Sequence, residues 1–352
     1  LLESGNVDYI ISTSSRGRIP TKDSVKLRRK AVERAIPCLT SMDTANALLN
    51  SLRSKFTKEC TERVNRNDMR ESRQKLRFLK MSGTKNDYIY FNCFDQQIDN
   101  PEGLAVMLSD RHLGIGGDGI CLIYPSKIAD ASMVLINQDG TNGGISGNAL
   151  RCIAKYLHDS GIAPRDIVTV EAEGLVRAVK LIKQYGEVTA ATVEMGEVKL
   201  DPAAIPVDLP GEKIINQPVK IGENEYNITC VNVGNPHCVV FTDNVDRIDL
   251  EEIGPKFEHN KIFPERTNTE FVKVISPQKL KMRVWERGNG ETWACGTGAC
   301  AAVVAAVENG YCSKDEEITV KLIGGELKIR YAGNTVTMTG DASTIFEGTI
   351  EV

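Results

Sequence analysis

Two residues that can transfer protons, Ser146 and Cys295, occupy matching places in two similar stretches of the sequence. Each is followed by a glycine and then by a short polar residue, and the two positions lie 149 residues apart. Asn86 and Asn235, which each follow a glycine-containing turn, are separated by the same 149 residues. One offset shared by separate segments is typical of a duplicated domain. We therefore predict two similar halves, each with one of the two proton-transferring residues.

Both residues directly precede a predicted helix of about twelve residues, which ends near Gly161 in the first half and near Gly310 in the second. A helix N-terminus carries unpaired N–H groups and a partial positive charge, so it binds a carboxylate. Because the same field favours a thiolate, we expect the pKa of Cys295 to be lowered towards neutrality. Two such helix ends facing each other across a cleft suit stereoinversion at an acidic carbon, which needs one proton-transferring group on each face.

Three zones of the chain differ in their residue patterns. Residues 1–52 alternate short apolar and polar segments and predict a partial α/β unit. Residues 53–76 are rich in charge and poor in apolar residues, which is typical of a solvated linker or an exposed helix. The remainder predicts an α+β fold of two pseudo-symmetric halves, each a mostly antiparallel sheet wrapped around a central helix. We place these halves at 77–193, joined by a last strand at 338–352, and at 194–337.

The composition excludes several classes of function. With a net charge of −4 and no basic cluster, the chain is not expected to bind nucleic acid. No apolar run approaches the roughly 20 residues that span a bilayer, so we expect no membrane segment. The ten cysteines include no Cys-x-x-Cys pair and the four histidines are isolated, so we expect no metal site and reduced thiols in a cytoplasmic protein. The chain begins at Leu1 without a signal peptide or a methionine, and we expect a fragment or a processed chain.

One glycine-rich segment imitates a dinucleotide site. Residues 114–119 fit the pattern G-x-G-x-x-G, which should follow a strand and open a helix. Here a helix-like segment at 102–108 precedes the glycines and a strand-like segment at 120–124 follows them, so the order is reversed. No lysine motif suggests a pyridoxal Schiff base either. The chemistry is therefore expected to need no cofactor.

From residue 77 to the C-terminus, the chain resembles diaminopimelate epimerase. The resemblance rests on four segments, 111–119, 234–237, 266–271 and 286–300, the last of which is similar to the second catalytic signature of that family. It implies interconversion of LL- and meso-2,6-diaminopimelate by two-base proton transfer, on the route to lysine and to cell-wall precursors. The implied partner is this small-molecule substrate, with a homodimer as the candidate assembly.

The resemblance also implies roles for single residues. Cys295 would be one acid/base residue and Ser146 would stand at the position of the other, with Glu286 and His237 near the reacting amino group. Gly147, Asn148, Gly296 and Thr297 would bind the reacting carboxylate, and Asn86, Asn137, Asn235, Asn268 and Arg287 would hold the amino and distal carboxylate groups of the substrate.

The first half departs from the family pattern at three positions. Ser146 stands where the family has cysteine, Ser82 where it has histidine, and Lys85 where it has glycine. Because an alcohol is a far weaker acid than a thiol, serine is a poor proton acceptor at neutral pH. Related cofactor-free racemases of this architecture include members with serine or threonine opposite cysteine, so activity is not excluded. Two alternatives stay open: an inactive amino-acid-binding homologue, and an epimerase or dehydratase of another amino acid, such as hydroxyproline or histidine.

The N-terminal zone, 1–52, has a resemblance of its own. Segment 9–18, with Asp23, Ser24 and residues 27–29, is similar to the end of the methylglyoxal-synthase-like allosteric domain of the carbamoyl-phosphate synthase large subunit, which binds nucleotide or ornithine effectors. Less than half of such a domain is matched. Within the zone we predict strands at 7–11 and 35–39, a Ser/Thr-rich loop at 12–18 and helices at 24–32 and 43–52.

Overall fold

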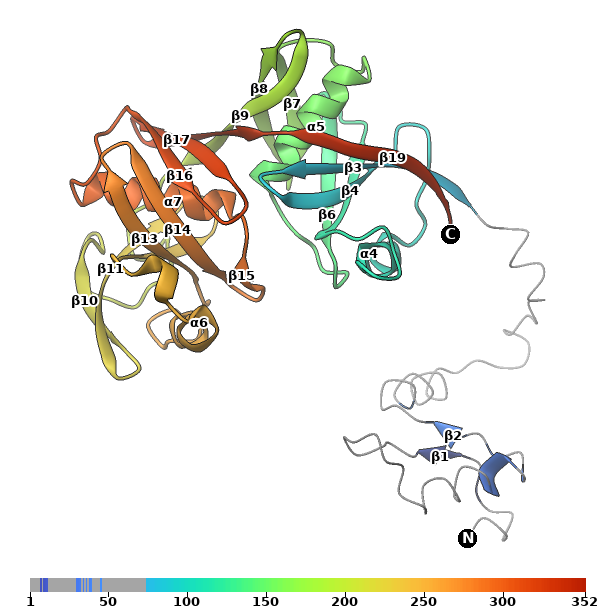
Figure 1. Ribbon diagram of the computed structural model, residues 1–352, viewed down its shortest axis with the longest axis horizontal. Helices are drawn as coiled ribbons and strands as arrows, with labels where there is room; N and C mark the ends of the chain where they lie inside the picture. Colours follow the sequence, from blue (N-terminus) through green and yellow to red (C-terminus); the bar gives the residue numbers. More distant parts are fainter. Residues whose placement is uncertain are drawn as a thin grey trace. The chain divides into compact units, whose positions relative to one another are not determined.

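The computed structural model describes residues 74–352 throughout and, before them, residues 7, 9–11, 30–32, 34, 36, 38–39 and 45 (Figure 1). The chain divides into two compact units, Leu1–Arg73 and Gln74–Val352. In the first unit, β1 (Ile10–Ile11) pairs in parallel with β2 (Cys38–Leu39). The predicted loop at 12–18, most of both predicted helices and the linker up to residue 73 lie outside the described residues.

The second unit is dominated by strands, which confirms the predicted α+β class. Its first eight strands and helices follow the order β3 (Lys75–Gly83), β4 (Asn86–Asn92), α4 (Pro101–Ser109), β5 (Gly119–Tyr124), β6 (Ala131–Asn137), α5 (Gly147–Asp159), β7 (Ile167–Ala172) and β8 (Leu175–Gln184), and are followed by β9 (Glu187–Glu197). These strands pair in chain order, antiparallel except for β4 with β5 and β6 with β7.

The second half has a similar succession. It contains β10 (Gln217–Ile221), β11 (Asn224–Asn232), β12 (Pro236–Phe241), η2 (Val245–Arg247), α6 (Leu250–Glu258), β13 (Asn268–Ser276), β14 (Lys279–Glu286), β15 (Gly290–Thr292), α7 (Gly296–Glu308), β16 (Glu317–Lys321), β17 (Glu326–Ala332) and β18 (Thr335–Asp341). Of these, β10, η2 and β15 are additional elements. The two parallel pairs recur as β12 with β13 and β14 with β16. The bounds of α5 and α7, and those of β3 and β11, differ by 149 at both ends.

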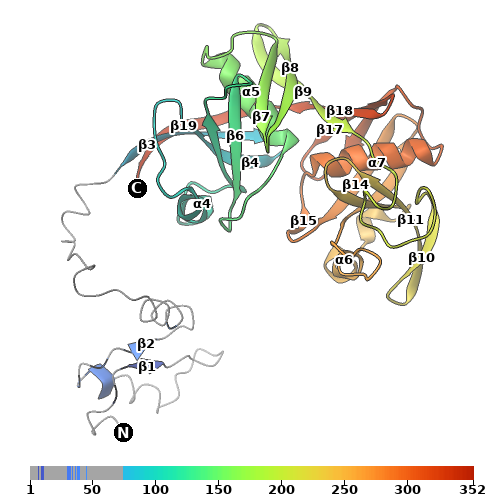
Figure 2. The same ribbon diagram turned by 180° about the vertical axis from the view of Figure 1, so that it is seen from behind.

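Two strand pairings join the halves. β18 pairs antiparallel with β9, and the chain then continues into β19 (Ser343–Glu351), which pairs antiparallel with β3. Figure 1 shows β19 in dark red running along β3, and Figure 2 shows β9 and β18 side by side from behind. The C-terminal segment thus completes the sheet of the first half, and the two halves share one continuous system of strands.

Each half is built around one helix. α7 is apolar on nearly its whole circumference, as expected for a helix enclosed by strands, and Ala302, Val303 and Ala306 have no exposed surface. α5 buries Ile153 and Leu157 in the same cluster. Both helices end in a turn at a glycine with positive φ, Gly161 at 79° and Gly310 at 75° in the predicted places. The lengths of the helices therefore follow from their sequences, and so does the position at which each one begins.

Candidate active site

The two central helices begin at one pocket. Ser146 is the N-cap of α5 and its Oγ accepts from the N–H of Ala149 at 3.3 Å. Cys295 is the N-cap of α7 and its Sγ accepts from the N–H of Gly298 at 3.3 Å. Both residues line the same pocket of about 860 Å³. The side chains that the 149-residue offset paired are therefore brought to one cavity, in the same local role.

A methionine from β18 fixes the approach of the helix ends. Gly147 and Gly296, the first residues of α5 and α7, both pack against Met338. A Cβ added at Gly296 would lie 2.9 Å from Met338 Sδ, and one added at Gly147 would be closer still to its Cε. The Cβ position of Gly296 is also 3.7 Å from Asn148 Oδ1. Glycine at both starts thus permits the close contact that places two helix N-termini at one cavity.

Most of the predicted site residues share this pocket. Arg287 instead lines an adjoining pocket of about 530 Å³, and its guanidinium donates to the carbonyl of Glu265 at 2.9 Å. Asn268 and His237 are buried, and Asn268 holds the backbone by donating to Pro236 O and accepting from the N–H of Arg287. The predicted residues that line the pocket are Asn86, Asn137, Ser146, Gly147, Asn148, Asn235, Glu286, Cys295, Gly296 and Thr297.

The environment of Cys295 overturns one expectation. Burial, together with the negative charges of Glu286 and Glu270, raises the pKa of Cys295 well above its usual value. Hydrogen bonds from Thr297 and from the N–H of Gly298 oppose this shift without reversing it. The prediction of a pKa lowered towards neutrality was therefore wrong, because it considered only the helix end. The raised pKa of Cys295 favours the thiol, the proton-donating form, over the thiolate.

Glu286 is placed to exchange a proton with that thiol. It ends β14, lines the pocket, and accepts a hydrogen bond from the hydroxyl of Thr292. Burial raises the pKa of Glu286, while its hydrogen bonds with Thr292 and Cys295 lower it in part. A carboxylate with a raised pKa is a stronger base, so proton transfer from Cys295 to Glu286 is easier than to an exposed carboxylate.

His237 belongs to a buried polar chain that reaches the pocket. Its Nδ1 lies 2.7 Å from Glu270 Oε1 and its Nε2 lies 2.8 Å from Asn235 Oδ1, and both His237 and Glu270 have no exposed surface. Glu270 Oε2 has no hydrogen-bond partner among the described residues. Because each ring nitrogen has a polar partner, the orientation of this buried ring is fixed. The sequence analysis did not single out Glu270, although an acid directly before the apolar residues of β13 was a usable signal.

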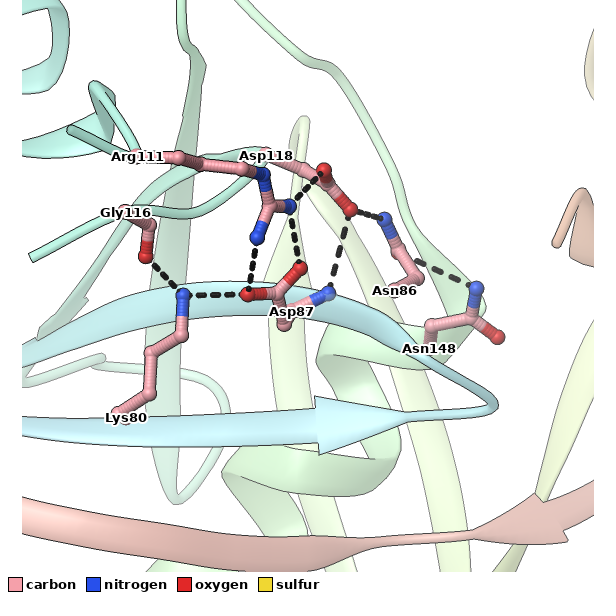
Figure 3. A network of polar contacts seen from close by, with 7 residues as sticks. All are labelled: Lys80, Asn86, Asp87, Arg111, Gly116, Asp118 and Asn148. Atoms are coloured by element: carbon pink, nitrogen blue, oxygen red, sulfur yellow. Dashed lines mark hydrogen bonds and ion pairs between the residues drawn. The ribbon is translucent and has the colours of Figure 1, made fainter. Parts of the chain in front are cut away.

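A second polar network orients Asn86 in the opposite wall (Figure 3). Asn86 Nδ2 donates to Asp118 Oδ2 at 2.7 Å, and Asn86 Oδ1 accepts from Asn148 Nδ2 at 3.2 Å. The buried guanidinium of Arg151 in turn donates to Asn148 Oδ1 at 2.9 Å. Because Nδ2 and Oδ1 of Asn86 each have a hydrogen-bond partner, the orientation of the amide is fixed, and so is the face that it presents to a ligand.

The same network continues to two cations. Arg111 Nη2 donates to Asp87 Oδ1 at 2.7 Å and to Asp118 Oδ1 at 2.9 Å. Lys80, with 5% of its side chain exposed, pairs with Asp87 at 2.5 Å and donates to the carbonyl of Gly116. Burial would raise the pKa of Asp87, but the hydrogen bonds from Arg111 and Lys80 outweigh it and hold that pKa below its usual value. The glycine-rich segment 114–119, which was rejected as a dinucleotide site, therefore contributes Gly116 and Asp118 to this network.

Within the described part of the chain, no group of three or more His, Cys, Asp or Glu residues is arranged to hold a metal ion. No described helix is long and apolar enough to cross a membrane.

The arrangement of strands and central helices recurs in solved structures of low sequence identity, which share the fold of this chain. The fold is similar to a PhzF-family phenazine biosynthesis protein from Bacillus anthracis, with a TM-score of 0.59 and 11% identity, covering 79% of this chain and 100% of that one. It is also similar to a hydroxyproline epimerase from Agrobacterium vitis, with a TM-score of 0.57 and 13% identity, covering 79% and 92% of the two chains.

Sequence comparison identifies the particular family. The diaminopimelate epimerase family matches residues 78–200 and 229–345. The diaminopimelate epimerase of Desulfovibrio desulfuricans is 50% identical over 281 residues, covering 78% of this chain and 97% of that protein. That of Acetivibrio thermocellus is 48% identical over 279 residues, covering 79% and 99%. The chain belongs to the diaminopimelate epimerase family, as the sequence resemblance implied.

Proposed function

We propose that this chain interconverts LL- and meso-2,6-diaminopimelate without a cofactor, on the route to lysine and peptidoglycan precursors. One observation carries the proposal: Cys295 and Ser146 cap two helices that begin at the same pocket. Relatives at 40–50% sequence identity are named diaminopimelate epimerases. From that similarity we infer that diaminopimelate is the substrate of this pocket.

The helix ends would bind the carboxylate attached to the reacting carbon. The N–H groups of Gly147, Asn148, Gly296 and Thr297 lie in the first turns of α5 and α7, where no intrahelical acceptor exists. Two partial positive charges directed at one carboxylate also stabilise the negative charge that develops when the α-proton leaves. We assign both substrate binding and stabilisation of the carbanion to these four groups.

Proton transfer would be faster on one face of the reacting carbon than on the other. On one face Glu286 accepts the thiol proton of Cys295, and the thiolate then removes the α-proton. On the other face the Ser146 hydroxyl must donate a proton and is left as an alkoxide, and among the described residues its one hydrogen-bond donor is the N–H of Ala149. Because an alkoxide is a much stronger base than a thiolate, this second transfer is the slow step. We therefore propose an epimerase that is impaired on the Ser146 face.

The remaining predicted residues would recognise the rest of the substrate. Asn86, Asn137 and Asn235 line the pocket and can bind amino and carboxylate groups. His237 and Asn268 would act from behind the pocket wall, through Asn235 and through the backbone of Arg287. We assign the distal end of the substrate to the region where Asn235 connects the two pockets.

The test follows hydrogen exchange and stereochemistry separately. Each diaminopimelate isomer is incubated in D₂O, with deuterium at the α-carbon followed by mass spectrometry and inversion by chiral chromatography. We expect the rate of exchange from one isomer to exceed the rate of inversion. Ser146→Cys should raise the rate of inversion at least tenfold, which corresponds to an activation free energy lower by about 1.4 kcal/mol. Ser160→Cys, at the other end of the same helix, is the matched control and should change neither rate. No gain from Ser146→Cys would refute the assignment of this face.

The serine itself supports a second candidate, an amino-acid-binding homologue without catalysis. Binding of diaminopimelate with neither exchange nor inversion would favour it over the epimerase. Exchange at another amino acid, such as hydroxyproline, would favour the third alternative.

We further propose that the two halves descend from one duplicated domain, with β19 completing the first. We propose that residues 1–52 derive from a methylglyoxal-synthase-like allosteric domain, which the parallel pairing of β1 and β2 supports. A cytoplasmic location is supported by the nine described cysteines, which are all free. A homodimer stays a prediction.

A further inference from the structure

An arginine with no exposed surface reaches back to the start of α5. Arg151 is the fifth residue of this helix, and its side chain is fully buried. Two glycines from neighbouring strands leave the space that it fills. A Cβ added at Gly340 in β18 would lie 2.8 Å from Arg151 Cζ, and one added at Gly83 in β3 would lie 3.2 Å from its Nη2. The absence of side chains at both glycines therefore accommodates this guanidinium.

The oxygen atoms that accept from this guanidinium all belong to neutral groups. Arg151 donates to Asn148 Oδ1 and to Thr84 Oγ1, each at 2.9 Å, and to the backbone carbonyls of Asp341 at 3.1 Å and Gly147 at 3.5 Å. The carboxylate of Asp341 is connected to it through Thr84, whose N–H and hydroxyl donate to Asp341 Oδ1. Because arginine stays protonated in proteins, the start of α5 has a buried positive charge without a directly bonded acid among the described residues.

The packing of the helix does not by itself require this charge. The position 149 residues after Arg151 is Cys300, which is buried in the apolar cluster around α7. Burying a cation is unfavourable unless hydrogen bonds and a negative charge compensate it. The hydrogen bonds are present in this structure, and the negative charge remains to be supplied. The cation is thus a feature of only one of the two helix ends at the pocket, the one capped by Ser146.

We propose that Arg151 is a positioning residue for the carboxylate-binding end of α5, and that the reacting carboxylate of the substrate compensates its charge. This inference rests on the proposed function. Arg151 acts in two ways. It holds Asn148, whose Nδ2 donates to Asn86, and it places a positive charge behind the N–H groups of Gly147 and Asn148. Because negative charge spreads into the carboxylate when the α-proton leaves, the cation stabilises the transition state more than the bound substrate.

Exchange of the α-proton of diaminopimelate in D₂O gives separate values of kcat and KM for the whole chain and its variants. Arg151→Gln keeps a side-chain NH₂ group and loses the charge, so kcat should fall roughly tenfold and KM should rise by less, roughly threefold. Arg151→Lys keeps the charge and should recover most of the loss in kcat. An unchanged kcat in Arg151→Gln, or no recovery in Arg151→Lys, would overturn the proposal.

A variant of an exposed residue tests the same charge with the opposite sign. Asp341→Asn keeps the oxygen that accepts from Thr84 and removes the negative charge that partly offsets Arg151. By calorimetry, diaminopimelate should bind roughly twofold more tightly to this variant, and added salt should reduce the gain. In the Arg151→Gln background the gain should disappear, since the two charges then no longer interact. Without a gain in the single variant the proposal fails, even where the Arg151 variants do not fold.

Asp130→Asn is the matched control. Asp130 Oδ2 accepts from the N–H and the hydroxyl of Thr169 at 2.8 and 2.9 Å, as Asp341 does from Thr84, and Asp130 does not line the pocket. If Asp341→Asn tightens binding no more than Asp130→Asn, the assignment of Arg151 is refuted while the proposed function stands. If the unsubstituted chain neither binds diaminopimelate nor exchanges its α-proton, the proposed function fails and this inference fails with it.

Discussion

Replacing Asp118 by asparagine tests whether the network in Figure 3 controls catalysis. Asp118 is the only group that accepts from Asn86 Nδ2 among the described residues, and it also accepts from Arg111. An asparagine of the same shape has one oxygen instead of two. If that oxygen accepts from Arg111, the NH₂ group of the new asparagine faces the NH₂ group of Asn86, and neither can accept a hydrogen bond. If the Asn86 amide rotates by 180° to avoid this, its NH₂ group faces the NH₂ group of Asn148 instead.

The size of the effect follows from these contacts. Losing a hydrogen bond to a charged group costs roughly 1.5–3 kcal/mol when it is buried. The side chains of Asp118 and Arg111 are 39% and 56% exposed, so solvent screening reduces this to about 1–1.5 kcal/mol. If the orientation of Asn86 is needed in the transition state, kcat/KM falls roughly five- to tenfold. The fold should survive, because Asp87 still pairs with both cations.

The assay compares kcat/KM for epimerisation, measured also in the Ser146→Cys background to give a larger signal. Asp110→Asn is the matched control, since Asp110 caps the neighbouring turn by accepting from His112 and Leu113 and does not line the pocket. Equal kcat/KM in the two variants, with equal melting temperatures, would refute the positioning role of Asp118. Rescue by Asp118→Glu is not expected, because the longer side chain displaces the carboxylate.

Other consequences can be measured independently. Lys80→Met should cost about 3 kcal/mol of unfolding free energy in urea, because it breaks a pair whose side chains are 5% and 15% exposed. The lowered pKa of Asp87 contributes stability that is full above its unfolded value of about 3.9 and is lost as the pH falls through the lower folded value, so Lys80→Met should flatten the acid end of the stability profile. Glu286→Gln removes a charge that raises the pKa of Cys295, so alkylation of Cys295 by iodoacetamide at fixed pH should become faster; an unchanged rate contradicts this. Lys85→Gly should raise the unfolding free energy by about 1 kcal/mol, since glycine adopts the +59° backbone without strain, and a lower melting temperature would show that the side chain stabilises the fold.

The local parts of the site could be predicted from the sequence. A residue with a cap-forming side chain before a helix, and a glycine after it, define where α5 and α7 begin and end, because these signals act over a few residues. The 149-residue offset then pairs Ser146 with Cys295. Asn86 and Asn235 were found in the same way, and both line the pocket.

What could not be predicted depends on contacts between distant segments. The pKa of Cys295 is raised because the residue is buried, with 6% of its surface exposed, and because Glu286 and Glu270 approach it from two strands. No pattern within the segment around Cys295 contains that information. The pairing of Lys80 with Asp87 likewise requires β3 and β4 to be folded against the glycine-rich segment.

At position 146 the structural and chemical requirements are separable. Ser146 Oγ and Cys295 Sγ each accept from the N–H three residues ahead, at 3.3 Å in both helices, so serine fulfils the capping role that cysteine fulfils in α7. Serine is among the preferred N-cap residues, so the substitution has no structural cost at this position. In the proposed mechanism, the cost of serine at this position is confined to proton transfer on one face of the substrate carbon. A chain with an intact pocket and unequal faces should therefore exchange the α-proton faster than it inverts the centre, and the ratio of the two rates measures the contribution of the missing sulfur.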